Sequence, residues 1–362
     1  MQTSISTSAQ RNGLAAFLKR NGSLIAIVLI MIALPFVVAL LDGRPFSDVL
    51  ANETGNAKFV QGLMIEIFIL AIYAISYDLI LGITGLLSFG HAMFFAVGAY
   101  GTGIMLKNLE WGILPTLGGI FVLGVLQALL FAVVLPRVKG ITFALVTLGL
   151  ASVFQIVVQS NEVGEYTGAD VGLQGVIPPD FLNTSTERFH LYLIGLALTV
   201  VIYLVYRRFV DSPTGRVCVA IRENEDRALM LGYNTFYFKL AALIVSSITA
   251  ALAGTLHTLH QPIVSPNVAS LSYTVLALLI ILIGGMGTLS GAMIGAAVFR
   301  LLEYFLDKQF SENASFILGL IYVLLVMFVP YGIVGTWQVK RLQIQQGRAR
   351  LYEALGLRKK PN

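Results

Sequence analysis

The sequence predicts an all-α membrane protein with about ten transmembrane helices, some of them short or broken. Of its 362 residues, 57% are hydrophobic and only 12% are charged. A soluble domain carries about a quarter charged residues, so this chain has too little polar surface to cover a globule of its size in water. Glycine, with 35 residues, is also more frequent in membrane helices than in soluble ones.

Apolar runs mark where the chain can cross a bilayer, because a helical span needs about 20 mostly apolar residues. The long runs cover residues 23–41, 59–81, 113–135, 141–159, 190–206, 236–257 and 315–334. The weaker or shorter runs cover residues 92–106, 271–283 and 288–306. We therefore expect an N-terminal tail over 1–22, a transmembrane domain over 23–337 and a basic tail over 338–362.

The placement of charge predicts the orientation of these spans, because Lys and Arg collect in cytoplasmic loops. The tail 1–22, the turn at Arg137, the connection 207–235 and the tail 338–362 are basic. The connections 42–58 and 160–189 are acidic. These signs alternate correctly only if both short segments, 92–106 and 271–283, cross the membrane. We therefore expect a multi-pass protein with both termini in the cytoplasm.

The basic C-terminal tail permits two interpretations. Lys and Arg beside a membrane helix are typical of a cytoplasmic flank, whereas basic tails elsewhere bind nucleic acid. We favour the flank and expect membrane lipids, not nucleic acid, around this chain.

Glycine-rich stretches flank the two short spans. Residues 82–91 read GITGLLSFGH and residues 284–288 read GGMGT. Glycine weakens helices, and non-helical backbone at membrane depth is tolerated only inside protein or along a wet cavity. Broken helices are a feature of transporters, although a simple loop or close helix packing is the alternative. The residues that we consider for a translocation path here are Ser88, Gly90, His91, Gly284, Gly285 and Gly287.

Ionisable residues within the spans are candidates for function, because charge is costly in lipid. Arg300 and Glu303 are three residues apart and can pair with each other on one helix. Asp78 lies near the expected cytoplasmic end of its span, where water can reach it. Glu66 is nearer the middle of the same span and joins the candidates for the translocation path.

Catalytic and nucleotide-binding motifs are absent from the sequence. It contains no G-x-x-x-x-G-K-[ST], no H-E-x-x-H and no G-x-S-x-G. The four histidines show no metal-binding spacing, and the one cysteine, Cys218, excludes an intramolecular disulfide framework. We therefore expect no enzyme activity, no metal and no cofactor in this chain.

The most distinctive polar stretch covers residues 212–232. Ser212 can cap a helix whose first turn suits Pro213, and Gly232 suits its end. Between them we expect a short helix or helix pair with mixed charge and an apolar edge, either a solvated loop or a docking surface for a cytoplasmic partner. The candidate docking residues are Arg222, Glu223, Glu225, Asp226, Ala228, Leu229, Leu231 and Gly232.

Four stretches together resemble a known family, the permease subunits of branched-chain (hydrophobic) amino-acid ABC importers. They read GLLSFGHAMFFAVGAY at 85–100, TFALVTL at 142–148, AIRENEDRALMLG at 220–232 and GGMGTLSGA at 284–292. The third resembles a degenerate EAA-x-x-x-G coupling motif, with Asp226 and Arg227 replacing Glu and Ala. The run from Ser290 departs from the family, where a Trp-Gly-Pro-like run is common.

The resemblance implies that the chain works in the bacterial inner membrane with several partners. These are a second related permease, two cytoplasmic ATPase subunits that bind ATP and Mg²⁺, and a periplasmic substrate-binding protein. Urea and short-amide permeases are similar and leave the substrate open. An ion-coupled secondary carrier, with Glu66, Asp78 and Arg300 as coupling charges, is the alternative from another class.

Overall fold

The structure describes most of the chain but little of the two expected tails. The structure, a computed structural model, describes residues 22, 24–50, 52, 55–184 and 187–341. The expected tails over 1–22 and 338–362 therefore lie outside the described residues, apart from Gly22 and residues 338–341.

Long α-helices make up most of the described chain, which confirms the prediction of an all-α membrane protein. Within the described residues, each of the ten predicted spans coincides with one helix. In chain order these are Leu24–Leu41, α3 (Asn56–Asp78), α4 (His91–Lys107), α5 (Ile113–Ala132), α6 (Ile141–Gln159), α8 (Arg188–Asp211), α11 (Thr235–His260), α12 (Leu271–Gly284), α13 (Leu289–Phe310) and α14 (Ala314–Phe328).

Two of these helices are short, as the sequence predicts. By length and composition, seven helical stretches of the described chain can cross a membrane, and neither α4 nor α12 is among them. They have 17 and 14 residues, respectively. At 1.5 Å per residue α12 covers only about 21 Å, less than the ~30 Å of a hydrocarbon core. Where α12 ends, the chain passes through a non-helical stretch before α13 begins.

The connections contain short elements that the apolar pattern does not predict. They are α2 (Phe46–Leu50), α7 (Gly164–Thr167) and 3₁₀ turns at Asn161–Val163, Ala169–Val171, Asp180–Leu182, Pro266–Ala269 and Ser311–Asn313. In addition, β1 (Leu173–Gln174) pairs antiparallel with β2 (Ile263–Val264), with Leu173 opposite Val264. These strands have two residues each, too few to show an alternating pattern in the sequence.

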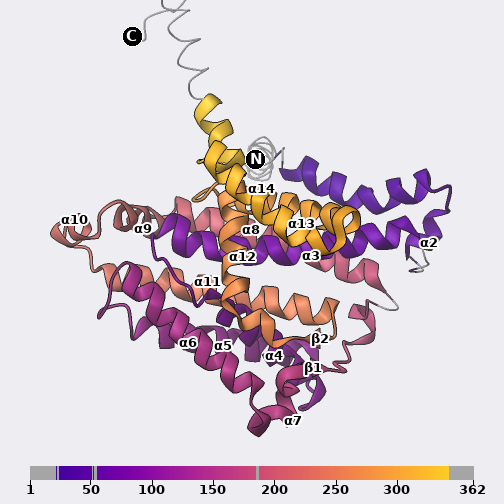
Figure 1. Ribbon diagram of the computed structural model, residues 1–362, viewed down its shortest axis with the longest axis horizontal. Coiled ribbons are helices and arrows are strands. Elements are labelled where there is room, and N and C mark those ends of the chain that lie inside the picture. Colours follow the sequence, from indigo (N-terminus) through magenta and orange to yellow (C-terminus); the bar gives the residue numbers. More distant parts are fainter. Residues whose placement is uncertain (1–21, 23, 51, 53–54, 185–186, 342–362) are drawn as a thin grey trace, which may run out of the picture. The chain divides into compact units, whose positions relative to one another are not determined.

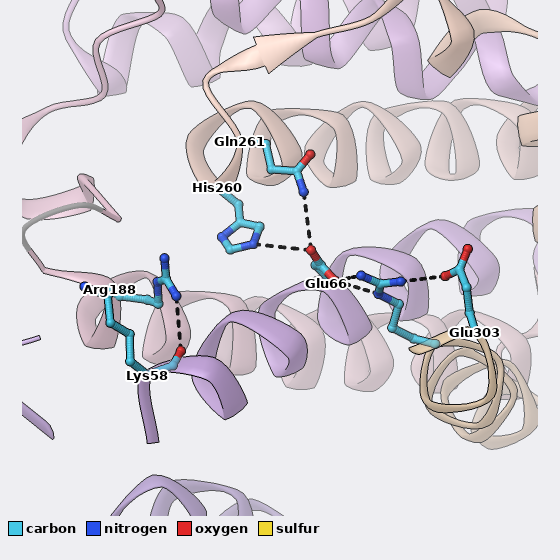
Figure 2. A network of polar contacts seen from close by, with 7 residues as sticks. Lys58, Glu66, Arg188, His260, Gln261 and Glu303 are labelled. Atoms are coloured by element: carbon cyan, nitrogen blue, oxygen red, sulfur yellow. Dashed lines mark hydrogen bonds and ion pairs between the residues drawn. The ribbon is translucent and has the colours of Figure 1, made fainter. Parts of the chain in front are cut away.

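Contacts divide the chain into two compact units, Met1–Ile65 with Asp180–Ala197, and Glu66–Pro179 with Leu198–Asn362. In the first unit, Ala39, Val49 and Ala57 form a small core, which Phe36 and Phe189 cover. The Arg188 guanidinium there donates to the carbonyl of Lys58 at 3.1 Å (Figure 2).

In the second unit, α11 packs most extensively on α4 and α5 (Figure 1). Hydroxyl groups along α11 donate to backbone carbonyls of its neighbours: Ser246 to Ser76 at 2.6 Å, Ser247 to Gly124 at 2.7 Å and Thr258 to Ala99 at 3.0 Å. Helices in lipid associate through small residues that allow close packing and through interhelical hydrogen bonds, because burying apolar surface there does not lower the free energy of association. These contacts make α11 a central element of this unit.

Candidate functional site

The connection 207–235 contains two short helices, α9 (Pro213–Glu223) and α10 (Glu225–Met230). Ser212 caps α9 by accepting the N–H of Gly215 at 3.2 Å, and Pro213 stands in the first turn, as predicted. Asn224 separates the helices with an extended backbone, and its side chain accepts the N–H of Arg227 at 2.9 Å. The segment is therefore a helix pair in which both helices have a side-chain cap.

Gly232 ends α10 in the way that the sequence predicts. Its φ is +87°, a conformation that glycine adopts without steric cost. The N–H of Gly232 donates to the carbonyl of Leu229 at 2.9 Å, and that of Tyr233 donates to Ala228 at 3.2 Å. This pair of bonds is a Schellman motif, which fixes the direction in which the chain leaves α10 toward α11.

Several of the candidate docking residues are engaged within this chain, among them Ala228 and Glu225. Ala228 is only 2% exposed. Glu225 accepts hydrogen bonds from Lys239 at 2.5 Å and from Thr235 at 2.9 Å, both on α11. Partial burial alone would raise the pKa of the Glu225 carboxyl, but the bonds from Lys239 and Thr235 and the nearby positive charges outweigh it and lower the pKa. Glu225 and Ala228 therefore hold α10 in place.

The accessible apolar side chains of the segment gather at the end of α10. Leu229, Met230 and Leu231, together called the apolar tip, are 45%, 86% and 71% exposed. Charged pairs flank this tip, Asp226 with Lys139 at 3.3 Å and Glu223 with Arg222 at 3.0 Å. An apolar centre with a polar rim is typical of a protein interface. Met230, the most exposed of the three, is absent from the sequence-based candidates; the docking role itself stays a prediction.

Most of the first glycine-rich stretch is non-helical, as expected, and it is buried in part: Ser88 and Gly90 are buried, whereas Gly85 is exposed. After α3 the chain forms a π-helix at Leu79–Ile83, and residues 84–90 have no regular structure until α4 begins at His91. The Tyr77 hydroxyl donates to the carbonyl of Ser88 at 3.0 Å, and His91 Nε2 lies 2.8 Å from the Ser76 hydroxyl. Gly90 lies so close to the carbonyl of Thr147 that an added Cβ would clash with it.

The second glycine-rich stretch, residues 285–288, joins α12 to α13. Gly285 and Gly287 have φ values of +122° and +77°, and Gly284 packs against the backbone of Gly291. The side chain of Thr288 donates to the carbonyl of Gly285 at 2.5 Å. Both stretches therefore contain the non-helical backbone that was expected; whether either lines a translocation path stays a prediction.

The two stretches meet at Asp78. Its Oδ1 accepts the N–H of Gly287 at 2.7 Å, and a Cβ on Gly82 would lie 2.5 Å from that same nitrogen. The guanidinium of Arg222, on α9, donates to the carbonyl of Gly82. We call these four residues, Asp78, Gly82, Arg222 and Gly287, the glycine latch, because they join both glycine-rich stretches to the α9–α10 pair.

The structure corrects the expectation that water solvates Asp78. Its side chain is fully buried, and Oδ2 has no hydrogen-bond partner among the described residues. A buried carboxylate is unfavourable unless charges or donors compensate it. Here the N–H of Gly287 and the positive charge of Arg222 compensate it only in part, because burial has the larger effect. The sequence shows Arg222 only as a basic residue of the candidate docking segment. The fold brings it close to Asp78.

A second polar cluster lies at the other end of α11 (Figure 2). Arg300 and Glu303 pair at 2.7 Å on α13, as their spacing predicts. Arg300 also contacts Glu66 Oε2 through Nε at 2.6 Å and through Nη2 at 2.5 Å. His260 and Gln261 approach Glu66 Oε1 at 3.8 and 3.3 Å. These five residues are called the Glu66 cluster, and the sequence pattern pairs only Arg300 with Glu303.

These features define a class of protein: a multi-pass helical membrane protein with broken helices and an exposed helix pair between two spans. Residues 59–329 match the family described as branched-chain amino acid transport system / permease component. Since this match covers most of the chain, the chain belongs to that family of transport permease subunits, which work in multi-subunit ABC systems.

Related permease proteins match most of the chain. The LivM permease protein of the high-affinity branched-chain amino acid transport system from Salmonella typhimurium is 27% identical over 360 residues, which cover 92% of this chain and 79% of the relative. The corresponding LivH protein of Escherichia coli is 26% identical, covering 75% and 93%. A probable LivM of Methanocaldococcus jannaschii is 24% identical, covering 82% and 85%. No solved structure matches this chain.

Proposed function

We propose that this chain carries branched-chain amino acids across the bacterial inner membrane as one permease subunit of an ABC importer. The observation that carries this proposal is the α9–α10 pair, which exposes an apolar tip and whose Arg222 donates to the carbonyl of Gly82 in the glycine latch. A chain driven by a separate ATPase needs such a connection between a docking surface and its broken helices. Relatives that are permease proteins of high-affinity branched-chain amino acid transport systems support the substrate.

The proposed assembly has four kinds of subunit. A second, related permease completes the path, two cytoplasmic ATPase subunits dock on the permeases, and a periplasmic binding protein delivers the amino acid. ATP and Mg²⁺ belong to the ATPase subunits in this proposal, because the sequence contains no P-loop in which phosphates could be bound. The permease itself performs no bond chemistry.

In the proposed mechanism, ATP-driven movement of the ATPase subunits displaces α9 and α10 together. Ser212 caps α9 and Asn224 caps α10, and Glu225 attaches α10 to α11 through Lys239. The guanidinium of Arg222 moves with α9 and changes its contact with the Gly82 carbonyl. The glycine-rich stretches then shift against each other at Asp78 and Gly287. This step would alternate the path between its outward- and inward-open states.

Both termini are cytoplasmic in this proposal, which places the connection 160–189 outside. In a Cys218→Ser background, Asn161→Cys should react with a membrane-impermeant maleimide on intact cells. Arg137→Cys, in the basic turn, should react only after the cells are permeabilised, and both side chains are exposed in the structure. Labelling of both positions, or of Arg137→Cys alone, on intact cells would refute this orientation.

Uptake by the reconstituted complex tests the transport function. Proteoliposomes that contain this chain with its proposed permease and ATPase partners should accumulate radiolabelled leucine when ATP and the binding protein are supplied. Vanadate should stop this uptake, because it traps the ATPase subunits, whereas a protonophore should leave it unchanged. The same vesicles should not accumulate urea. Uptake that stops with the protonophore and continues in vanadate would instead require an ion-coupled carrier.

The apolar tip should contribute most to ATPase docking. Met230→Asp places a charge at the most exposed apolar position, and loss of a central anchor typically costs at least about 2 kcal/mol, so recovery of the ATPase in a pull-down should fall tenfold or more. Val171→Asp, at a 72% exposed position in the connection 160–189, is the matched control and should not change recovery. Ala228→Trp is not a suitable test, because Ala228 is buried in this chain.

If Met230→Asp and the control recover equal amounts of ATPase, the apolar tip is not the docking surface.

A further inference from the structure

The Glu66 cluster contains more carboxylates than guanidinium groups. It contains two carboxylates, Glu66 and Glu303, but a single guanidinium, Arg300, which binds both. Counted over Glu66, Glu303 and Arg300 alone, negative charge exceeds positive charge by one. Its carboxylates and guanidinium lie within segments long and apolar enough to cross a membrane, and their side chains are only 22–34% exposed. Ionisable groups at membrane depth are costly and usually face a cavity or a functional path.

A cavity of about 200 Å³ adjoins this charge. Glu66, Arg300 and Glu303 form one part of its wall with Gln261 and His257. The apolar part of the wall consists of Ile69, Leu70, Leu276, Phe299 and the ring of Tyr273. Apolar walls with a few convergent polar groups are typical of small-molecule sites. An engineered cavity of about 150 Å³ is known to hold benzene, so this cavity has room for an aliphatic side chain of four carbons.

Arg300 has hydrogen-bonding capacity to spare. Of the five N–H donors of a guanidinium, three make the contacts to Glu66 and Glu303 that the described residues provide. A carboxylate that entered the cavity could therefore be bound without first displacing either glutamate. The excess negative charge next to it would favour a cationic group on the same molecule. The combination of donors, excess charge and apolar wall matches one kind of solute.

We propose that this cavity binds the zwitterionic substrate during transport, with its ammonium group at Glu303 and Glu66, its carboxylate at Arg300 and its aliphatic side chain on the apolar wall. This inference rests on the proposed function, whose substrates are amino acids of this shape. The cavity is bordered by His257 and Gln261, at the end of α11 remote from α10. At 1.5 Å per residue it lies roughly 35 Å from the α10 end of that helix, so the substrate site and the docking segment are separate.

Glu303→Gln tests the site with little disturbance of the fold. It removes the excess charge, while Arg300 keeps its two contacts to Glu66 and can still donate to the amide oxygen at position 303. An amide at position 303 can still accept a hydrogen bond from the ammonium group, but the bond loses its charge assistance, and charge-assisted bonds are about twice as strong as neutral ones. Leucine uptake at low concentration by the complete complex should therefore fall tenfold or more. ATP hydrolysis stimulated by the loaded binding protein should stay within twofold, because docking and coupling are untouched.

Asp307→Asn is the matched control, since Asp307 lies one turn further along α13 and is exposed. It should leave both uptake and hydrolysis unchanged. Leucine uptake by Glu303→Gln at the wild-type rate would overturn the inference and make the Glu66 cluster purely structural. If instead the wild-type complex failed to import leucine, the proposed function would be refuted, a result distinct from failure of this site alone.

A measurement on the wild-type complex covers the case in which Glu303→Gln does not assemble. Without binding protein, radiolabelled leucine bound to the complex should be displaced by unlabelled leucine. It should be displaced at least tenfold less well by 4-methylpentanoate, which lacks the ammonium group, and by 3-methylbutylamine, which lacks the carboxylate. Equal displacement by all three compounds would show that neither charge is recognised and would overturn the inference.

Discussion

Two stretches of non-helical backbone, residues 84–90 and 285–288, lie within this helical membrane protein, and their N–H and carbonyl groups need partners there. Lipid offers none, and each unsatisfied group costs several kcal/mol. Some partners are local, because the N–H groups of Thr84, Gly85 and Leu86 donate to carbonyls of the preceding π-helix. Side chains supply others: the Asp78 carboxylate accepts the N–H of Gly287, and the Tyr77 hydroxyl donates to the carbonyl of Ser88. The Arg222 guanidinium donates to the carbonyl of Gly82, just before the first stretch. The α9–α10 pair is thus part of what permits the helices to break.

The helix α11 connects the two polar regions of the second unit. At its start, Thr235 and Lys239 hold Glu225 of α10, and at its end His260 and Gln261 approach Glu66. Between these ends its hydroxyl groups bind the backbones of α4 and α5. One continuous helix therefore carries both the attachment of the docking segment and part of the proposed substrate cavity, which gives the proposed mechanism a defined structural element through which the two can be linked.

Local patterns in the sequence were sufficient for the helices, the glycine-rich breaks, the Ser212 cap and the pairing of Arg300 with Glu303, because each depends on residues near each other in the chain. Contacts between distant segments were not predictable in this way. Glu66 and Arg300 are 234 residues apart, so Glu66 looked like an isolated acid. Asp78 looked accessible because only the fold brings Gly287 over it, and the burial of Ala228 against the chain leaves no trace in the local pattern.

The central claim is that Arg222 transmits movement of the docking segment to the glycine-rich stretches. Its most direct test is the number of leucine molecules imported per ATP hydrolysed by the reconstituted complex with Arg222→Met. The account predicts that hydrolysis stimulated by the binding protein persists while this ratio falls about tenfold, the effect expected for loss of one charge-assisted hydrogen bond. Arg216→Met, which alters an exposed arginine on the same helix, should keep the ratio. An unchanged ratio in Arg222→Met would contradict the account.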